Sequence, residues 1–253
     1  MILNLISENK SQIEFDSGFF FGKGLFETIL VLNKPVFLDE HLDRLNAGLK
    51  VLGIDNYVSK AMVHQNIGEY KSCAVKIMVS EKNIVFSNRP LSYTSKQYIN
   101  GFKVKLSNIK RASNNPLVYL KSFNYLENIL EKEKYSKEGF DEVIFMNNEN
   151  YLCEGSMSNI FVIFDDYIIT PSINSGILNG IVREFIIKIL KHNYTIIEKQ
   201  VPYSLINKSK GMFLTNSLMG IMWVNQFDDI KLNYCTEYEE LYKSYNTFLN
   251  LYK

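Results

Sequence analysis

Strand-like and helical patterns alternate along the whole chain, and this alternation limits the possible folds more than any other feature of the sequence. Two apolar runs, CAVKIMVS at 73–80 and NIVFSNRP at 83–90, are separated by a short polar turn and predict paired strands. Residues 39–52 repeat leucine with helical spacing on one face, and Gly53 marks the end of that helix. Residues 24–38 predict a hairpin with its turn near Asn33. We therefore expect an α/β (α+β) fold.

The pattern also predicts two lobes. Residues 1–106 form a smaller N-terminal α/β lobe that ends with the strand-like run FKVKLSNI. Residues 107–115, SNIKRASNN, have no apolar periodicity and predict a linker. Residues 116–253 form a larger C-terminal α/β lobe, which opens with a helix from about Phe123 to Ser136.

Composition excludes several classes of protein. The 253 residues carry a formal net charge of +1 and are 46% hydrophobic, which suits a buried core and argues against non-specific nucleic-acid binding. The three cysteines are odd in number and far apart, as expected in a reducing compartment. The N-terminal residues lack a signal-peptide pattern, and no apolar run approaches about 18 residues. We expect a cytoplasmic protein without membrane contact.

Lys121 lies inside the apolar stretch LVYLKSFNYL. A lysine in such a stretch reaches solvent or is buried with a partner, because burying an unpaired ammonium costs several kcal/mol. Chemistry offers a third possibility. A lysine condensed with an aldehyde as an imine is no longer a free ammonium, and desolvation makes lysine easier to deprotonate for that reaction.

Two charged residues elsewhere are candidates for cofactor contacts, although each also has an ordinary interpretation. Glu154 ends an apolar strand about 30 residues beyond Lys121, and alone it fits a solvated strand-end carboxylate. Arg44 shares a helix face with His41. Its guanidinium suits a phosphate, but a surface arginine is equally compatible with the pattern.

Two turns are candidate anion sites. Asn179 and Gly180 precede a helix whose first N–H groups favour an anion, and they also fit an ordinary helix cap. Short polar side chains at Thr215, Asn216 and Ser217 form either a second anion-binding turn or a plain turn.

An imine-forming lysine, an acid beside a pyridine nitrogen and a phosphate site together match pyridoxal phosphate. Other sites fit less well. The run GFFFGKG has three residues between its glycines and no Ser or Thr after the lysine, unlike a P-loop. The three histidines lack metal-ligand spacing, so we expect no metal site.

The sequence resembles the class IV (fold-type IV) pyridoxal-phosphate enzymes, which include branched-chain aminotransferases, D-amino-acid aminotransferases and aminodeoxychorismate lyases. The resemblance covers nearly the whole chain in the family's order. It lies in FGKGLFETI, FLDEHLDRL, LKSFNYLENIL, DEVIFMNNENYLCEGSMSNIF, GILNGIVRE and FLTNSLMGI. It implies a two-lobed enzyme with the cofactor between the lobes, a small-molecule substrate and a homodimer.

The resemblance also implies roles for individual residues. Lys121 forms the imine with the cofactor, Glu154 pairs with the pyridinium nitrogen, and Tyr125 contacts the phenolic oxygen. The phosphate is held by Arg44, the backbone amides of Ile181 and Val182, and the turn at Asn216 and Ser217. The family often has Thr at the position of Val182, so a hydroxyl contact is lost here.

Within the family, the motifs are most similar to aminodeoxychorismate lyase. Branched-chain enzymes tend to carry Gly-Thr-Ala where TNSL stands, and Gly-Gly after the lysine. D-amino-acid transaminases have a basic carboxylate-binding segment where this chain has SEKN. The resemblance therefore implies release of pyruvate and formation of 4-aminobenzoate for folate biosynthesis. A class IV aminotransferase acting on D-amino or branched-chain amino acids is the alternative.

The implied catalytic residues are Lys121, as general base, and Thr28, which assists proton transfer. Phe26 occupies a position where some transaminases have Tyr. Candidates for binding the substrate carboxylate are Arg89 and Tyr93.

Overall fold

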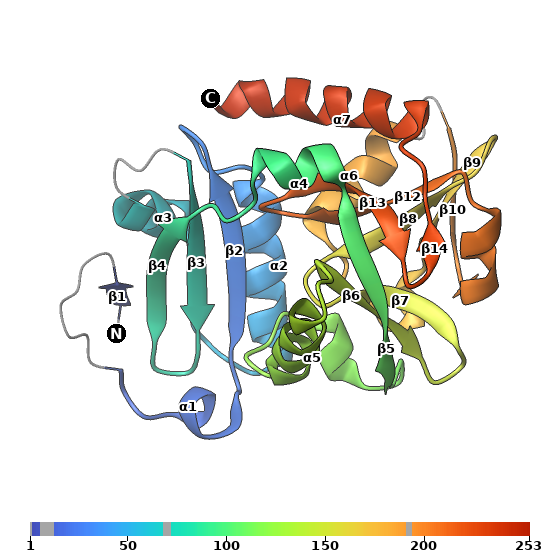
Figure 1. The fold of residues 1–253 in the computed structure, drawn as a ribbon. Coiled ribbons are helices and arrows are strands. Elements are labelled where there is room, and N and C mark those ends of the chain that lie inside the picture. Colours follow the sequence, from blue (N-terminus) through green and yellow to red (C-terminus); the bar gives the residue numbers. More distant parts are fainter. Residues whose placement is uncertain (1, 6–12, 68–71, 191–193) are drawn as a thin grey trace. The chain divides into compact units, whose positions relative to one another are not determined.

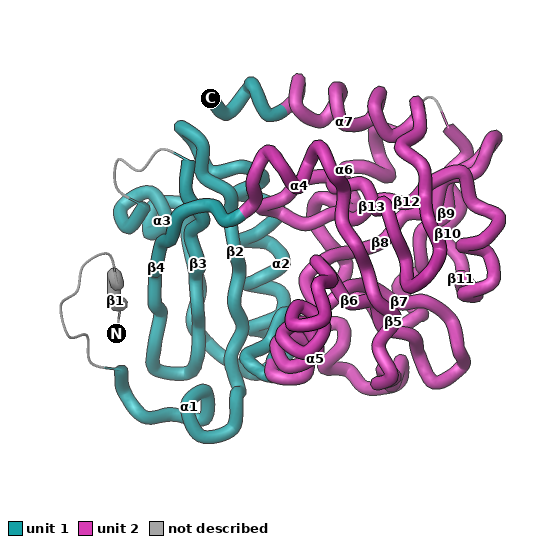
Figure 2. Tube along the Cα trace, viewed as in Figure 1, with its two compact units in different colours: residues 1–92, 120–125, 249–253 teal, residues 93–119, 126–248 magenta. Residues whose placement is uncertain are grey.

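A four-stranded sheet and a ten-stranded sheet organise the part of the chain that this computed structural model describes, residues 2–5, 13–67, 72–190 and 194–253. Each sheet belongs to one of two units (Figures 1 and 2). Unit 1 comprises residues 1–92, 120–125 and 249–253, and unit 2 comprises residues 93–119 and 126–248. The predicted mixture of helices and sheet is confirmed.

The sheet of unit 1 has the strand order β1-β4-β3-β2. Strands β2, β3 and β4 are antiparallel neighbours, and β1 pairs in parallel with β4. The elements of unit 1 are β1 (Ile2–Leu5), α1 (Ser17–Phe21), β2 (Leu25–Val31), α2 (Leu38–Val51), α3 (Lys60–Ile67), β3 (Cys73–Val79), β4 (Ile84–Pro90) and the 3-10 turn η4 (Asn250–Tyr252).

Helix α2 lies along β2 and buries one face of this sheet (Figure 1). The predicted leucine stripe of α2 packs against Leu25, Ile29 and Val31, which alternate along β2. Residues between them, including Phe26 and Thr28, therefore have side chains on the opposite face of the sheet. The helix ends near Gly53, which adopts a left-handed φ of 63° as expected for a helix stop.

The sheet of unit 2 has the strand order β10-β9-β8-β12-β13-β5-β6-β7-β11, and its tenth strand, β14, pairs with β13 beside this path. Its two end strands, β10 and β11, are separated in sequence by Gln200 alone, so the sheet curls toward a nearly closed barrel. The elements of unit 2 are α4 (Ser95–Asn100), β5 (Phe102–Arg111), η1 (Pro116–Tyr119), α5 (Leu126–Lys137), β6 (Glu142–Asn147), β7 (Tyr151–Gly155), β8 (Asn159–Ile163), β9 (Tyr167–Pro171), η2 (Ile173–Ser175), α6 (Ile181–Leu190), β10 (Thr195–Lys199), β11 (Val201–Pro202), η3 (Tyr203–Lys208), β12 (Gly211–Asn216), β13 (Gly220–Phe227), β14 (Ile230–Lys231) and α7 (Thr236–Leu249).

The predicted linker at 107–115 is partly wrong, because residues 107–111 continue strand β5. Strand β5 pairs with β6 and β13, so the contacts assign it to unit 2 and not to the N-terminal lobe predicted as 1–106. Residues 107–111 show no alternation of apolar and polar side chains, because the pairing of β5 with β6 is irregular between Leu106 and Lys110.

Two other predictions also need correction. The helix expected from Phe123 begins at Leu126, because residues 121–123 pair instead with β2. The hairpin expected at 24–38 has only one isolated bridge, between Val31 and Pro35, in place of its second strand. The sequence also predicts a helix over residues 62–70, and the end of that helix lies outside the described residues.

The glycine-rich run GFFFGKG is not a nucleotide loop. Its first residues form helix α1, whose N–H groups at Gly18 and Phe19 bond to the Asp16 carboxylate at 2.9 and 3.2 Å. Gly22 closes the helix with a φ of 70°. Among the described residues, no helix combines the length and the apolar character needed to cross a bilayer.

Candidate active site

Lys121 lies on a short extended segment that adds to the edge of the unit 1 sheet. Its carbonyl accepts a hydrogen bond from the Phe26 N–H at 2.9 Å, and Ser122 forms an antiparallel bridge with Leu25. Because side chains alternate along an extended chain, the buried Ser122 faces the core with Leu25 and Lys121 faces the other way. The apolar residues around Lys121 therefore do not bury it completely, and its side chain is half-buried.

Two aromatic rings lie beside the Lys121 ammonium. Its Nζ is 4.4 Å from the centre of the Phe26 ring and 5.2 Å from that of Tyr125. The two rings meet edge-to-face at 5.2 Å. Cation–π attraction stabilises the charged amine, and the partly dry surroundings limit its hydration. Unit 1 thus places Lys121 beside Tyr125, and the cofactor roles expected of both residues stay predictions.

A buried carboxylate fixes the orientation of Arg44. Glu27 on β2 accepts hydrogen bonds from Arg44 Nε at 2.7 Å and Nη2 at 2.9 Å, a bidentate arrangement. The same carboxylate contacts His41, which lies about one turn earlier on α2 and whose Nδ1 is 2.7 Å from Glu27 Oε2. Since an ionised carboxylate can only accept, Nδ1 carries the proton.

The charges of this group follow from its burial. Burial alone would raise the pKa of Glu27, but Arg44 and His41 outweigh it and hold that pKa far below its ordinary range. Burial lowers the pKa of His41; Glu27 opposes this, while Arg44 and Lys121 lower it further. The group therefore contains an ionised Glu27, a charged Arg44 and a neutral His41.

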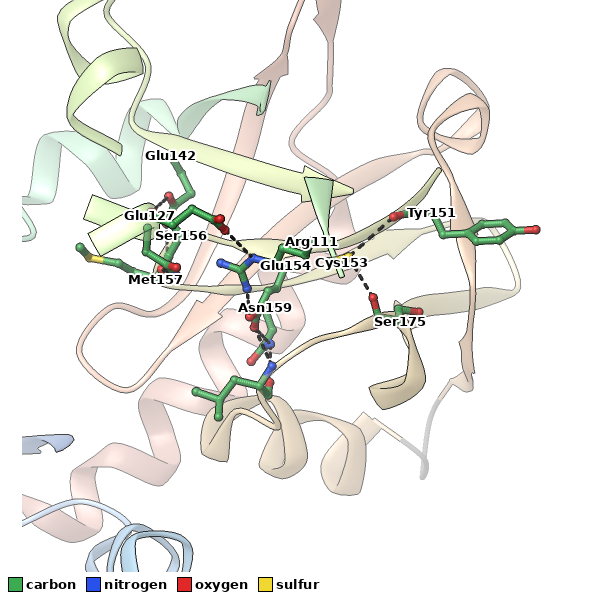
Figure 3. Close-up of polar contacts among 12 residues, drawn as sticks. Arg111, Glu127, Glu142, Tyr151, Cys153, Glu154, Ser156, Met157, Asn159 and Ser175 are labelled. Atoms are coloured by element: carbon green, nitrogen blue, oxygen red, sulfur yellow. Dashed lines mark hydrogen bonds and ion pairs between the residues drawn. The ribbon is translucent and has the colours of Figure 1, made fainter. Parts of the chain in front are cut away.

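Glu154 on β7 is buried in unit 2, with 7% of its surface exposed (Figure 3). Arg111 Nη1 donates to Oε1, while Oε2 accepts from Asn159 Nδ2 at 3.0 Å and from the Leu178 N–H at 3.1 Å. The Arg111 guanidinium also lies 4.2 Å from the centre of the Phe145 ring. The solvated strand-end interpretation of Glu154 is therefore wrong, because the side chain is enclosed and bonded through both oxygens.

A second buried carboxylate holds the loop that follows Glu154. Glu142 accepts hydrogen bonds from the hydroxyls of Ser156 and Ser158, the latter at 3.1 Å, and from the Met157 N–H at 3.3 Å (Figure 3). This loop separates Glu154 from Asn159 and sets the distance between them. Neighbouring Cys153 is not a candidate nucleophile, because burial raises its pKa to about 12.

Ile181 and Val182 open helix α6, as predicted, with their side chains buried. The first N–H groups of a helix lack partners within it and favour an anion. Gly180 precedes them, and a Cβ at this position would overlap Asn159 Oδ1. Only a glycine therefore fits between this helix start and the residue that bonds Glu154.

The turn at Asn216 and Ser217 joins β12 to β13. The Asn216 Oδ1 accepts from the N–H groups of Leu218 at 3.0 Å and Met219 at 2.7 Å, so this side chain shapes the turn. Its Nδ2 lies 2.9 Å from the Tyr93 hydroxyl. Beside it, the buried Thr215 hydroxyl has no hydrogen-bond partner among the described residues.

The predicted residues thus divide between the units. Unit 1 holds Arg44, Lys121, Tyr125 and Thr28, and unit 2 holds Glu154, Ile181, Val182, Asn216 and Ser217. That all of them surround one cofactor stays a prediction. Of the carboxylate candidates, Arg89 is exposed on β4 in unit 1 and Tyr93 belongs to unit 2.

Sequence reasoning missed Glu27, His41 as its partner, Arg111 and Asn159. One signal was available for Glu27. It lies two residues from both Leu25 and Ile29, so its side chain points to the same buried face of the strand, where a carboxylate needs a cation. No comparable signal marks Arg111, because it lies 43 residues before Glu154.

Comparison with known proteins decides the family. The sequence model of amino-transferase class IV matches residues 24–227. The chain belongs to the class IV aminotransferase family. It is 31% identical to an aminodeoxychorismate lyase of Bacillus subtilis over 198 residues, 69% of this chain and 67% of the lyase. It is 29% identical to a D-alanine aminotransferase of Staphylococcus aureus, over 79% of this chain and 77% of that enzyme.

Solved structures agree with the family assignment. A putative 4-amino-4-deoxychorismate lyase of Legionella pneumophila matches with a TM-score of 0.86 at 27% identity, covering 100% of this chain and 99% of that one. The expected fold-type IV architecture of this class IV chain is confirmed. Because the relatives include both lyases and aminotransferases, family membership leaves the reaction open.

Proposed function

We propose that this class IV protein is a pyridoxal-phosphate-dependent 4-amino-4-deoxychorismate lyase that forms 4-aminobenzoate and pyruvate. The observation that carries the proposal is the half-buried Lys121 ammonium over the rings of Phe26 and Tyr125. Such a lysine is partly desolvated, reachable and held in place, which an imine-forming lysine requires.

Three features of the described residues fit the cofactor. The Glu27 carboxylate fixes the Arg44 guanidinium, so that Arg44 is oriented for a phosphate. Gly180 at the start of α6 carries no Cβ, and the amides of Ile181 and Val182 there suit a phosphate. The Thr215 hydroxyl at the Asn216–Ser217 turn, which has no partner within the described part of the chain, suits a further acceptor.

Glu154 suits the pyridine nitrogen. Its two oxygens are held by Arg111, Asn159 and the Leu178 N–H, so the carboxylate is both ionised and fixed in direction. An ionised carboxylate holds a proton on the nitrogen beside it, and Tyr125 would contact the phenolic oxygen. When bound, pyridoxal phosphate supplies an electron-accepting ring.

The chain's own residues then handle the protons. The Lys121 amine, once free, removes the proton from the ring carbon next to the substrate amine. The bond between the ring and the enolpyruvyl oxygen breaks, the departing three-carbon unit gains a proton as pyruvate, and the ring becomes aromatic. The Thr28 hydroxyl, on the sheet face of Phe26, is placed in this proposal as the donor that assists proton transfer.

Two features favour the lyase over the aminotransferase alternative. The whole-length similarity to a putative lyase supports it. The short SEKN segment also forms the tight turn between β3 and β4, closed by the Ser80 N–H bonding to the Asn83 carbonyl at 2.9 Å, where D-amino-acid transaminases carry a basic carboxylate-binding segment. A homodimer and a cytoplasmic location are part of the proposal by resemblance.

The decisive experiment follows products from aminodeoxychorismate without any added oxo acid. We expect 4-aminobenzoate and pyruvate in equal amounts over many turnovers, because the lyase needs no amino acceptor. The same preparation is given D- or branched-chain amino acids with 2-oxoglutarate. Efficient formation of glutamate, without pyruvate from aminodeoxychorismate, would refute the lyase in favour of the aminotransferase.

Two variants test the residue roles. Borohydride treatment of the loaded protein should leave a pyridoxyl group on Lys121, and Lys121→Ala should lose it while keeping its circular dichroism spectrum. Glu154→Gln should keep the cofactor but lose turnover by about 100-fold or more, because a neutral amide holds no proton on the nitrogen. Glu133→Gln, on an exposed position of α5, is the matched control.

A further inference from the structure

Arg183 lies in the first turn of α6, and only 2% of its surface is exposed. Its guanidinium donates through Nη1 to the Asn179 Oδ1 at 3.1 Å. Through Nη2 it donates to the Pro171 carbonyl at 2.9 Å and to the Glu198 carboxylate at 2.8 Å. Pro171 ends β9, and Glu198 lies on β10, the parallel neighbour of β9. These three contacts form a clamp, the Arg183 clamp, between the helix start, two strands and the connection before the helix.

The Arg183 clamp holds the connection between β9 and α6 at both of its ends. This connection spans residues 172–180, and the guanidinium bonds to Pro171 just before it and to Asn179 near its end. Within the connection, the Leu178 N–H donates to Glu154 Oε2 at 3.1 Å. The clamped segment is therefore the one that carries a contact of the candidate active site and leads into α6.

The clamp also restrains the N–H groups that open α6. The N–H groups of Ile181 and Val182 belong to the first turn and have no acceptor within the helix. Arg183 follows them directly in the same turn. Because a hydrogen bond weakens steeply when its donor points away from the acceptor, an anion at this helix start depends on the direction of these groups. A turn anchored to two strands and to the preceding residues keeps that direction.

Stability alone explains the clamp less well. A buried guanidinium is stabilising only when its charge is paired and its donors are satisfied. The Nε of Arg183 is buried without a hydrogen-bond partner among the described residues, and the side chain of its ion-pair partner Glu198 is 40% exposed. An apolar side chain of similar volume would stabilise the same space as well or better. Only a rigid planar fork, however, holds acceptors from three separate segments in one plane.

We propose that Arg183 is a positioning residue for the cofactor phosphate and acts through the N–H groups of Ile181 and Val182. The buried guanidinium fixes the first turn of α6 and makes no direct contact with the anion. This rests on the proposed function for the identity of the anion as the phosphate of pyridoxal phosphate, and not on the reaction that follows. A change that keeps the charge of Arg183 but removes its fork should therefore weaken phosphate binding.

The test compares pyridoxal phosphate with pyridoxal, which lacks only the phosphate. Cofactor-free protein is incubated with increasing concentrations of either compound and treated with borohydride, and the pyridoxyl label on Lys121 is quantified by mass spectrometry. Wild type should bind pyridoxal phosphate more tightly. Arg183→Lys and Arg183→Met should each weaken pyridoxal phosphate binding by about tenfold or more, equivalent to one charge-assisted hydrogen bond, and change pyridoxal binding by less than about twofold.

Matched variants separate positioning from folding and from charge. Lys188→Met removes an exposed charge from the same helix and should change neither affinity. Circular dichroism and urea unfolding are measured for every variant, and Arg183→Lys, which keeps the buried charge, carries the comparison if Arg183→Met does not fold. A lower unfolding free energy with an unchanged ratio of the two affinities indicates a purely structural role and overturns the proposal. Full pyridoxal phosphate affinity in Arg183→Lys also overturns it, because the charge and not the fork would then matter.

Failure of the proposed function is read from wild type. If wild type binds pyridoxal phosphate but releases no pyruvate from aminodeoxychorismate, the lyase fails, and the ratio of affinities in the Arg183 variants still decides the positioning role. If pyridoxal phosphate leaves no label on Lys121 of wild type, the cofactor assignment fails and the positioning role fails with it.

Discussion

Replacing His41 by asparagine should make the protein less sensitive to acid. His41 is fully buried, its Nδ1–H donates to Glu27, and its Nε2 has no hydrogen-bond partner among the described residues. Burial lowers its pKa from the ordinary value of 6.5, with Arg44 and Lys121 adding to the effect. As the pH falls, the unfolded chain therefore binds a proton at His41 before the folded protein does.

The sign and size follow from that difference. Above pH 6.5 neither state binds the proton at His41, so the stability is fully present; as the pH falls, the unfolded state gains the proton first and stability is lost. At about pH 5.5 the unfolding free energy has fallen by at most about 1.4 kcal/mol, which corresponds to a drop of about 3–6 °C in Tm for a chain of this size. Glu27, whose pKa is also lowered, loses its contribution only below its ordinary 4.5.

Urea unfolding followed by circular dichroism at about pH 8 and about pH 5.5 measures the effect. The asparagine side chain of His41→Asn can still donate to Glu27 but cannot titrate, so the drop in unfolding free energy should be smaller than in wild type by up to about 1.4 kcal/mol. His64→Asn, an exposed position on α3, should leave the drop unchanged. An equal or larger drop in His41→Asn would refute a neutral buried His41.

Two further predictions concern unit 2. Arg111→Met should lower the unfolding free energy by about 3–5 kcal/mol in urea titrations, because it leaves the buried Glu154 without its cation; a change below about 1 kcal/mol would contradict a structural ion pair here. Gly180→Ala should weaken pyridoxal phosphate binding by about tenfold, because the new Cβ displaces Asn159. The control is Gly53→Ala, where no atom lies within 4 Å of the new Cβ. It strains the backbone but should leave the affinity for pyridoxal phosphate unchanged. Equal affinities in the two glycine variants would contradict this account of Gly180.

Local patterns predicted much of the secondary structure. Leucine spacing predicted α2, and apolar runs predicted β3, β4 and the strands around Glu154, because burial of one face imposes a period on the sequence. The errors lie where pairing with distant segments decides the conformation. The helix predicted from Phe123 begins only at Leu126, because hydrogen bonds to residues 24–26 hold residues 121–123 extended.

The candidate site shows the same division. The sequence by itself singled out candidate residues, since an apolar setting for Lys121 and a strand-end Glu154 are visible without coordinates. Only the tertiary structure decided their partners: Phe26 for Lys121, Arg111 for Glu154, and Glu27 for Arg44. Those contacts depend on strand register between segments far apart in the chain, and one residue of slippage would move every such side chain to the other face of its sheet.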